Sequence, residues 1–204
     1  MKNTTILFIL FLATYLSAGC GPDTDKLKEG DIIFQSSKSG QSYAIQLATK
    51  SQYSHCGIIY KDGDNFYVYE AIQPVKKTLL KDWIARGDDD HYVIKRLKNR
   101  SVLTPAVLEK MKDETKSHLD KDYDIYFGWS DNDMYCSELV WKAYKRAAGI
   151  EVGKLQKLRE FDLSHPVVQK KVQERYGNDI PLDETVISPA SIFESELLEV
   201  VKED

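Results

Sequence analysis

The sequence predicts a single α+β domain. Candidate strands cluster in the first half of the chain, candidate helices lie around and after them, and no internal repeat divides the chain into units. A length of 204 residues with 42% hydrophobic residues is sufficient for one domain with a substantial core. The net charge of -4 arises from acidic and basic residues that are interleaved along the chain, so we expect no nucleic-acid partner.

The first 20 residues, MKNTTILFILFLATYLSAGC, predict a secretory signal. Lys2 gives a basic start, the stretch from Ile6 to Leu16 is apolar, and small residues lead to Cys20. The apolar stretch is shorter than the roughly 20 residues that a membrane-spanning helix needs. The segment resembles a bacterial lipoprotein signal, in which the cysteine becomes the lipidated first residue, except that Ser17 stands where leucine is usual. A plain cleaved signal and an uncleaved anchor are the alternatives.

These features divide the chain into three parts. We expect a signal peptide over residues 1–20, a polar tether over 21–26 and the folded domain over 27–204. If Cys20 carries lipid, the protein is anchored in the bacterial cell envelope, on the periplasmic or outer face. The sequence indicates neither the membrane that holds the anchor nor the oligomeric state.

The first half of the domain predicts strands and a hairpin separated by short helices. Alternating β-branched and aromatic residues around a Gly-Asp turn are typical of a hairpin, and apolar residues spaced three or four apart are typical of a helix. The expected elements are a strand over 30–35, a helix over 42–50, a hairpin over 53–72 with its turn at 61–64, a helix over 79–86 and a strand over 91–97.

The second half predicts mainly helices. Thr104 and Pro105 indicate a helix start, and the helix extends to His118. Leu119 to Tyr135 has no periodicity and is expected to be a long loop, a kind of segment that is often functional. The remaining expected elements are a helix over 134–148 closed by Gly149, a helix over 166–176 capped by Ser164, a helix that begins at Ser188-Pro189 and a strand or tail over 197–202.

Cys136 is the first candidate for chemistry. Apolar residues follow it at helical spacing, so its side chain should lie on the buried face of the helix, in the first turn after an N-cap at Asp133. Unpaired amides and the helix dipole favour an anion there, and thiols at such positions ionise well below their usual pKa. A cysteine on an apolar helix face is, alternatively, ordinary core packing.

His55 and Glu70 form the second candidate. If Tyr60 and Asn65 close a four-residue loop, His55 stands directly opposite Glu70 and the two side chains can share a hydrogen bond. That bond would orient the imidazole, as the third member of a nucleophile, base and carboxylate triad does. A register slip of one residue would place the two side chains on opposite faces of the sheet.

The other cysteine and histidine residues indicate no site. Strand alternation turns Cys56 away from the His55 face, so we expect it to pack in the core and not to form a disulfide with Cys136. No pair of residues has the spacing of a zinc site and no glycine loop suits phosphate, so we expect neither a metal nor another cofactor. The histidines in charged, surface-like surroundings are His91, His118 and His165.

An ordered set of short motifs resembles a known family. The motifs are GDIIF, YSHCGII, YVYEAI, YCSELVWKAY and SPASIF, and together they resemble the YiiX-like branch of permuted papain-fold hydrolases, relatives of the NlpC-type cell-wall endopeptidases. The resemblance covers the chain from Leu27 to Phe193. It implies a circularly permuted papain-like fold in which a small antiparallel sheet packs against helices and the nucleophile lies at a helix N-terminus.

The resemblance also implies roles for individual residues. Cys136 corresponds to the nucleophile, His55 to the base and Glu70 to the group that orients the base. For the oxyanion site, the backbone amide of Cys136 is one candidate donor. Gln35 and Tyr135 are candidates for the second donor.

Three functions remain open at this stage. The first is a cysteine amidase or peptidase of the envelope that cleaves a peptidoglycan-like peptide or a small amino-acid amide. The second is a lipid acyl hydrolase or acyltransferase with the same triad, for which Tyr126 and Trp129 in the aromatic loop YDIYFGW would contact the acyl chain, unless these aromatic residues only pack over the helix start. The third is an envelope binding module that has kept the fold without the activity.

Overall fold

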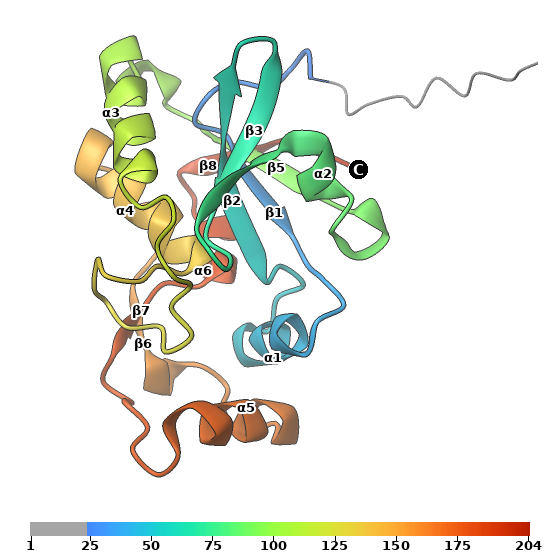
Figure 1. Cartoon of the computed structure of the whole chain (residues 1–204), viewed down its shortest axis with the longest axis vertical. Coiled ribbons are helices and arrows are strands. Elements are labelled where there is room, and N and C mark those ends of the chain that lie inside the picture. The colour runs from blue at the N-terminus through green and yellow to red at the C-terminus, as the bar shows by residue number, and fades with distance from the viewer. Residues whose placement is uncertain (1–23) are drawn as a thin grey trace, which may run out of the picture.

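A six-stranded antiparallel sheet lies at the centre of the computed structural model, which describes residues 24–204 (Figure 1). The strand order is β4-β3-β2-β1-β5-β8. The strands are β1 (Ile32–Gln35), β2 (His55–Asp62), β3 (Asn65–Glu70), β4 (Lys76–Leu79), β5 (Val93–Leu97) and β8 (Leu198–Glu203), and a separate pair is formed by β6 (Gln156–Lys157) and β7 (Thr185–Val186). The α+β fold with an antiparallel sheet is therefore confirmed.

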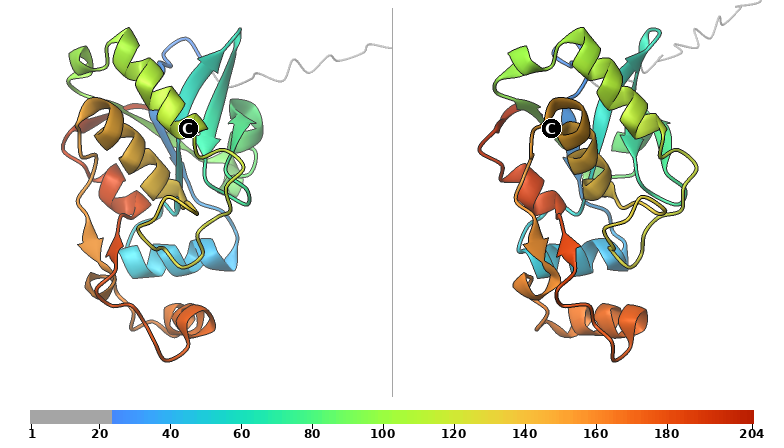
Figure 2. Two further views of the ribbon diagram at one scale, coloured as in Figure 1. Left: turned by 60° about the vertical axis from the view of Figure 1, so that its left-hand side comes forward. Right: turned by 90° about the vertical axis from the view of Figure 1, so that its left-hand side faces the viewer.

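Helices cover both faces of this sheet (Figures 1 and 2). α3 and α4 pack together on one face, where α4 contacts β2, and α2 lies against β3 on the other face. α1 and α5 contact each other beyond one end of the sheet. The helices are α1 (Gly40–Thr49), α2 (Leu80–Ile84), α3 (Pro105–Lys116), α4 (Cys136–Ala148), α5 (Pro166–Tyr176) and α6 (Pro189–Phe193), with 3-10 turns at Asp88–Asp90, Arg100–Val102 and Leu158–Glu160.

The alternation of side chains along β2 builds two hydrophobic clusters. Cys56, Ile58 and Tyr60 are buried in the cluster that includes residues of α4. Ile59 points to the opposite face and is buried with Trp83 of α2. The sheet therefore separates two hydrophobic clusters, and α4 packs against the sheet in the larger of them.

The β2–β3 hairpin has a tighter turn than the sequence predicted. Asp62 pairs with Asn65, so two residues form the loop and the expected four-residue loop is wrong. Gly63 occupies the turn with φ of +60°, a conformation that glycine adopts without strain. The shift is two residues, which preserves the face of every side chain.

The helix ends agree with the sequence at most positions and differ at two. Thr104 and Ser188 cap α3 and α6 as predicted, and Gly149 in the left-handed region closes α4. The N-cap of α4 is Tyr135 and not Asp133, so α4 begins at Cys136. The N-cap of α5 is His165, whose ring accepts the amide of Val167, so the predicted cap at Ser164 is wrong.

The predicted signal and tether lie almost wholly outside the described residues. Cys20 and the rest of 1–23 are not described, so lipidation of Cys20 stays a prediction. Within residues 24–204, no helix combines the length and the apolar character needed to cross a membrane.

Candidate active site

Cys136 is the first residue of α4, and its side chain is buried. The carboxylate of Glu138 accepts the amide of Tyr135 at 3.4 Å, which satisfies the donor just before the helix. Within residues 24–204, the amides of Cys136 and Ser137 donate to no backbone acceptor outside the helix, as expected in a first helical turn. The thiol therefore lies where unpaired donors favour negative charge.

His55, at the start of β2, lies between this thiol and a buried carboxylate. Its Nε2 atom is 2.6 Å from Oε2 of Glu70, and its ring also forms a hydrogen bond with Cys136. The ring of Trp83 stacks on the imidazole, with centroids 5.8 Å apart and planes inclined by 22°. The structure thus brings the three predicted triad residues together from β2, β3 and α4.

The second oxygen of Glu70 is held by two further residues. Thr78 of β4 donates its hydroxyl to Oε1 at 2.5 Å, and Arg86, just after α2, pairs with the same oxygen. Burial favours the neutral carboxyl, but the hydrogen bond from His55, together with Thr78 and the charge of Arg86, lowers the pKa of Glu70. The carboxylate is therefore ionised and fixed in orientation. Sequence analysis found neither Thr78 nor Arg86, because one is in an unpredicted strand and the other lies 16 residues from its partner.

The thiol and the imidazole stabilise each other in the charged state. A hydrogen bond from Cys56 and the hydrogen bond and charge of His55 lower the pKa of Cys136 well below that of a free thiol, against the effect of burial. Burial lowers the pKa of His55, but the bonds to Cys136 and Glu70 outweigh it and raise the value to about 9. At neutral pH the pair is a thiolate and an imidazolium, which is the nucleophilic form.

Cys56 is a core residue that also contacts Cys136. It is fully buried, as predicted, and burial raises the pKa of its thiol well above the usual value. Its thiol and its backbone amide both form hydrogen bonds with Cys136. Both cysteines are free thiols. The sequence correctly placed Cys56 and His55 on opposite faces of the sheet. It did not predict the contact of Cys56 with Cys136, because Cys136 reaches the end of the sheet from the α4 side.

An apolar cavity of about 100 Å³ opens beside Cys136. α1 and α5 form two of its walls, and Tyr123 and Phe127 from the loop before α4 contribute aromatic rings. Gln41 of α1 donates to the hydroxyl of Tyr123 at 3.2 Å and so joins the loop to the helix wall. Cys136 therefore lines an apolar pocket.

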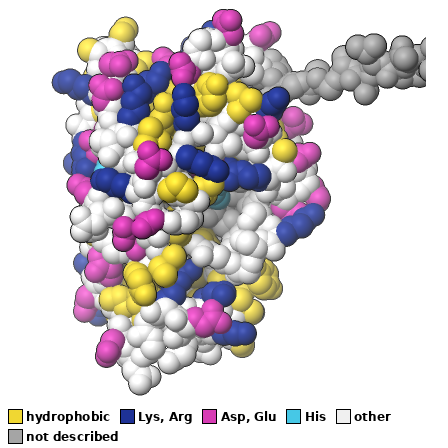
Figure 3. Space-filling view, viewed as in Figure 1, with side chains coloured by type: hydrophobic (Ala, Val, Ile, Leu, Met, Phe, Trp, Pro, Cys, Tyr) yellow, Lys and Arg dark blue, Asp and Glu magenta, His cyan; other side chains and the backbone are white. Residues whose placement is uncertain are grey.

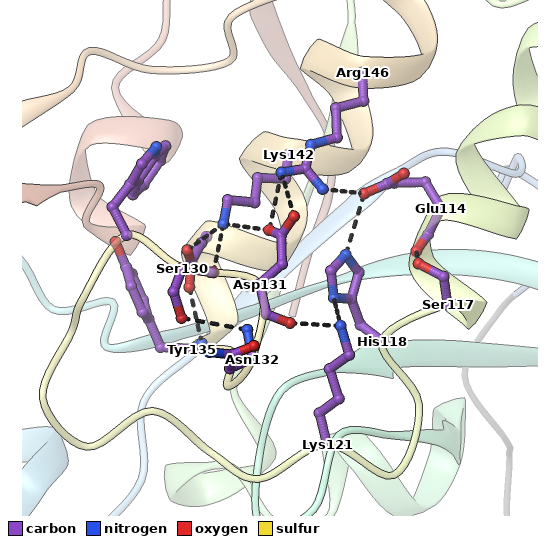
Figure 4. Close-up of polar contacts among 12 residues, drawn as sticks. Glu114, Ser117, His118, Lys121, Ser130, Asp131, Asn132, Tyr135, Lys142 and Arg146 are labelled. Carbon is purple, nitrogen blue, oxygen red and sulfur yellow. Dashed lines mark hydrogen bonds and ion pairs between the residues drawn. The ribbon is translucent and has the colours of Figure 1, made fainter.

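A network of ion pairs holds the loop between α3 and α4 (Figure 4). The buried ammonium of Lys142 binds the carbonyl of Ser130 at 2.7 Å and the carboxylate of Asp131 at 2.8 Å. Arg146 binds Asp131 at 2.9 Å and Glu114 of α3 at 2.7 Å. These bonds tie the residues immediately before Cys136 to the bodies of both helices.

The other predicted site residues occupy varied positions. Gln35 is buried and pairs with His55 between β1 and β2. The hydroxyl of Tyr135 accepts the amide of Ile187 at 3.1 Å, and its ring lines the cavity. Tyr126 is 54% exposed and lies against Tyr176. The oxyanion roles of the Cys136 amide, Gln35 and Tyr135 stay predictions.

The aromatic loop contributes to the cavity through other residues than those proposed. Trp129 packs on Trp141 and on the ammonium of Lys142. Neither Tyr126 nor Trp129 lines the cavity, whereas Tyr123 and Phe127 of the same loop do. A substrate contact of Tyr126 or Trp129 stays a prediction.

Comparisons with known proteins agree with this architecture. Residues 26–202 match the family model described as permuted papain-like amidase enzyme, YaeF/YiiX, C92 family. The chain is 46% identical to the uncharacterized protein YiiX of Escherichia coli (strain K12), over 100% of this chain and 97% of that protein. A crystal structure described as metalloprotein yiiX from Escherichia coli O157:H7, DUF1105, superposes with a TM-score of 0.83 at 49% identity, covering 88% of this chain and 98% of that one.

The description of that crystal structure as a metalloprotein calls for a test of the donors in this chain. Among residues 24–204, no group of three or more His, Cys, Asp or Glu side chains is arranged to hold a metal ion. The side chains of Cys136, His55 and Glu70 lie together, but they interact with one another: Cys136 with His55, and His55 with Glu70. The described residues therefore do not fit a metal site.

Proposed function

Because the chain belongs to the family of permuted papain-like amidases, and is thus a cysteine hydrolase, we propose that Cys136, His55 and Glu70 are the triad that cleaves an amide bond in the cell envelope. The observation that carries this proposal is the contact of a helix N-terminal thiol with an imidazole that a buried carboxylate orients. The arrangement has the roles of nucleophile, base and orienting group.

The first half of the proposed reaction forms a thioester. The thiolate of Cys136 attacks the amide carbonyl, and the backbone amide of Cys136 donates to the developing oxyanion. The imidazolium of His55 protonates the leaving nitrogen, the carbon–nitrogen bond breaks, and the amine departs. The acyl group remains on sulfur, and His55 is left neutral.

The second half returns the enzyme to its starting state. Once Cys136 is acylated, its negative charge is absent, so one of the interactions that raise the pKa of His55 is lost. Neutral His55 then accepts a proton from water, which attacks the thioester and releases a carboxylic acid. Glu70 keeps the imidazole oriented through both halves.

The substrate and the location rest on the sequence as well as on the site. The segment before the domain resembles a lipoprotein signal ending at Cys20, which supports an envelope enzyme anchored to a membrane. Amides in that compartment include peptidoglycan-like peptides and small amino-acid amides, which we propose as substrates.

Reaction of the thiol tests the proposal directly. Iodoacetamide at pH 7 should modify Cys136 selectively, detected by the mass of the peptide that contains it, and Cys136→Ala should abolish turnover of muropeptides. His55→Gln should slow the labelling. In Cys56→Ala the label should still appear on the peptide of Cys136, at a lower rate, because the hydrogen bond from Cys56 helps to lower the pKa of Cys136. A Cys136→Ala variant with unchanged turnover would end the assignment of the nucleophile.

One observation favours a second candidate. The cavity beside Cys136 is lined mainly by apolar side chains, among them Ala44, Leu158, Val168 and Val172. Such a lining suits an acyl chain, so the same triad would serve a lipid acyl hydrolase or acyltransferase. Incubation with acyl esters and, separately, with muropeptides distinguishes the two, because only a true acyl donor leaves its own mass on Cys136.

A further inference from the structure

Arg175 of α5 is a cation inside the cavity that holds the nucleophile. It is half-buried, and its guanidinium lies 4.7 Å from the centre of the Phe127 ring. In the part of the chain that the structure describes, Arg175 forms no ion pair with a carboxylate. The side chain is thus positioned by an aromatic ring while its fork of N–H donors remains available.

The charged residues that line the cavity are basic, whereas the chain as a whole is acidic. The whole chain carries a net charge of -4, yet the described residues that line the cavity include Lys171 and Arg175 and no aspartate or glutamate. Lys171 is already paired with Glu174 at 2.7 Å. The charge of Arg175 contributes to the lowered pKa of Glu174, but Arg175 forms no ion pair with it, so within residues 24–204 Arg175 is the cavity cation without an ion-pair partner.

The same cation lies within electrostatic range of the reacting centre. Burial raises the pKa of the Tyr123 hydroxyl, the charge of Cys136 raises it further, and the charge of Arg175 lowers it. One phenol thus interacts with both the sulfur and the guanidinium. In Figure 3 hydrophobic and basic side chains lie beside each other over the lower part of the molecule, where Figure 1 places α5.

We propose that Arg175 determines specificity by binding a carboxylate or phosphate group of the substrate at the apolar cavity, so that this enzyme acts on amides of anionic, amphiphilic molecules. The inference rests on the proposed function, because it assumes that Cys136 is the nucleophile. A guanidinium binds either anion through two parallel hydrogen bonds, and the apolar walls exclude water that would weaken them. The apolar part of the substrate would contact α1 and the aromatic rings.

Alkylation of Cys136 tests this without a known substrate. The probes are 4-(iodoacetamido)butyrate, its neutral carboxamide of the same length and 2-(iodoacetamido)ethyl phosphate. In each reaction the sulfur forms a bond to the methylene carbon and iodide leaves. Rates at pH 7 are measured by mass spectrometry and divided by the rate of each probe with N-acetylcysteine, which removes differences in intrinsic reactivity.

The wild-type protein should react about tenfold faster with a carboxylate or phosphate probe than with the carboxamide, as a charge-assisted pair would give. The faster of the two anionic probes identifies the preferred group. Arg175→Gln should remove the preference and Arg175→Lys should retain part of it. Lys170→Gln should leave it unchanged, because Lys170 is an exposed cation of α5 outside the cavity lining. With plain iodoacetamide, Cys136 of all four proteins should react faster than N-acetylcysteine, which shows that the fold and the thiolate are intact.

Two results would overturn the inference. One is an equal normalised rate of charged and neutral probes with the wild-type protein, and the other is an anion preference that survives Arg175→Gln. Failure of the proposed function looks different, because Cys136 would then react with plain iodoacetamide no faster than N-acetylcysteine does.

Discussion

Nε2 of His55 lies 2.6 Å from Oε2 of Glu70, although the two residues do not face each other across the hairpin. Ile58 pairs with Tyr69, so the register places Gly57 opposite Glu70. A side chain at Gly57 would stand between the carboxylate and the imidazole on the same face of the sheet. The missing side chain lets Glu70 reach diagonally to His55, which lies two residues from Gly57 along β2.

Substitution of Gly57 should damage both stability and the triad. A Cβ atom there would lie 2.4 Å from Cγ1 of Val68 and 2.8 Å from the carbonyl oxygen of Tyr69. Because the second contact is with backbone, the hairpin must move, and Gly57→Ala should lower the free energy of unfolding by about 1–3 kcal/mol. Urea denaturation measures this loss, and the rate of iodoacetamide labelling of Cys136 should fall with it. Gly40→Ala at the start of α1, where an added Cβ meets no atom within 4 Å and φ is not positive, is the control for a glycine substitution, and labelling unchanged in Gly57→Ala would contradict the explanation.

Arg86 should set the acidic limit of thiol reactivity. Its charge helps to lower the pKa of Glu70, so Arg86→Gln should raise that pKa and protonate the carboxylate at a higher pH. His55 then loses its anionic partner, its pKa falls, and the thiolate of Cys136 is less stabilised. The acid limb of the labelling rate against pH should move to higher pH, with a larger loss at pH 6 than at pH 8.

The control for this prediction is Lys77→Gln. Lys77 lies on β4 next to Thr78, but it pairs with Asp62 at the surface and not with Glu70. Its removal should leave the pH profile in place. An unshifted profile in Arg86→Gln would show that Thr78 and His55 alone hold the carboxylate.

The pH dependence of labelling should also separate Cys136 from an ordinary thiol. The pKa of Cys136 is held well below that of a free thiol by its hydrogen bonds and by the charge of His55, so the labelling rate should rise much less between pH 6 and pH 8 than that of a free thiol. A free thiol with a pKa of about 8.5 gains about two orders of magnitude in rate over that range. Stopped-time labelling at several pH values distinguishes these curves. A Cys136 curve parallel to that of N-acetylcysteine would mean that no thiolate–imidazolium pair exists.

The sequence predicted the placement of His55, Glu70 and Cys136 better than that of the residues around them. Period-two alternation places His55 and Glu70 on one face even when the register is wrong by two, and helical spacing places Cys136 in the first turn of α4. The residues that hold the carboxylate of Glu70 could not be predicted in this way. Thr78 and Arg86 reach Glu70 only through the tertiary packing of β4 and α2, which leaves no periodic pattern in the sequence. The contact of Cys56 with Cys136 was missed for the same reason.

The cavity, too, could not be predicted from sequence patterns. Its walls come from α1, the loop before α4, and α5, which are brought together only by the packing of the whole chain. The aromatic loop was recognised from composition, but composition cannot tell which of its rings turn inward. Tyr123 and Phe127 line the cavity, and Tyr126 is exposed.

The ion pair of Glu138 and Lys142 should stabilise the helix that presents Cys136, in a manner that depends on pH. Both side chains are buried, and Nζ of Lys142 lies 2.6 Å from Oε1 of Glu138. Burial raises the pKa of Glu138 to about 7, against the opposing effect of Lys142, compared with about 4.3 in an unfolded chain. A raised carboxyl pKa means that the folded state binds the proton more tightly, so this contribution to stability is present at low pH and is lost as pH rises through 7. In Lys142→Met the carboxylate has no buried cation, so the free energy of unfolding should fall by about 3–5 kcal/mol at pH 8. At pH 5 Glu138 is protonated and the loss should be much smaller.

The double variant Glu138→Gln with Lys142→Met removes the buried charge and should recover most of the stability at pH 8, while Arg146 still binds Asp131 in every variant. Urea denaturation at both pH values measures these differences, and a loss in Lys142→Met that is equal at pH 5 and pH 8 would assign the effect to packing and to the lost hydrogen bond with Ser130.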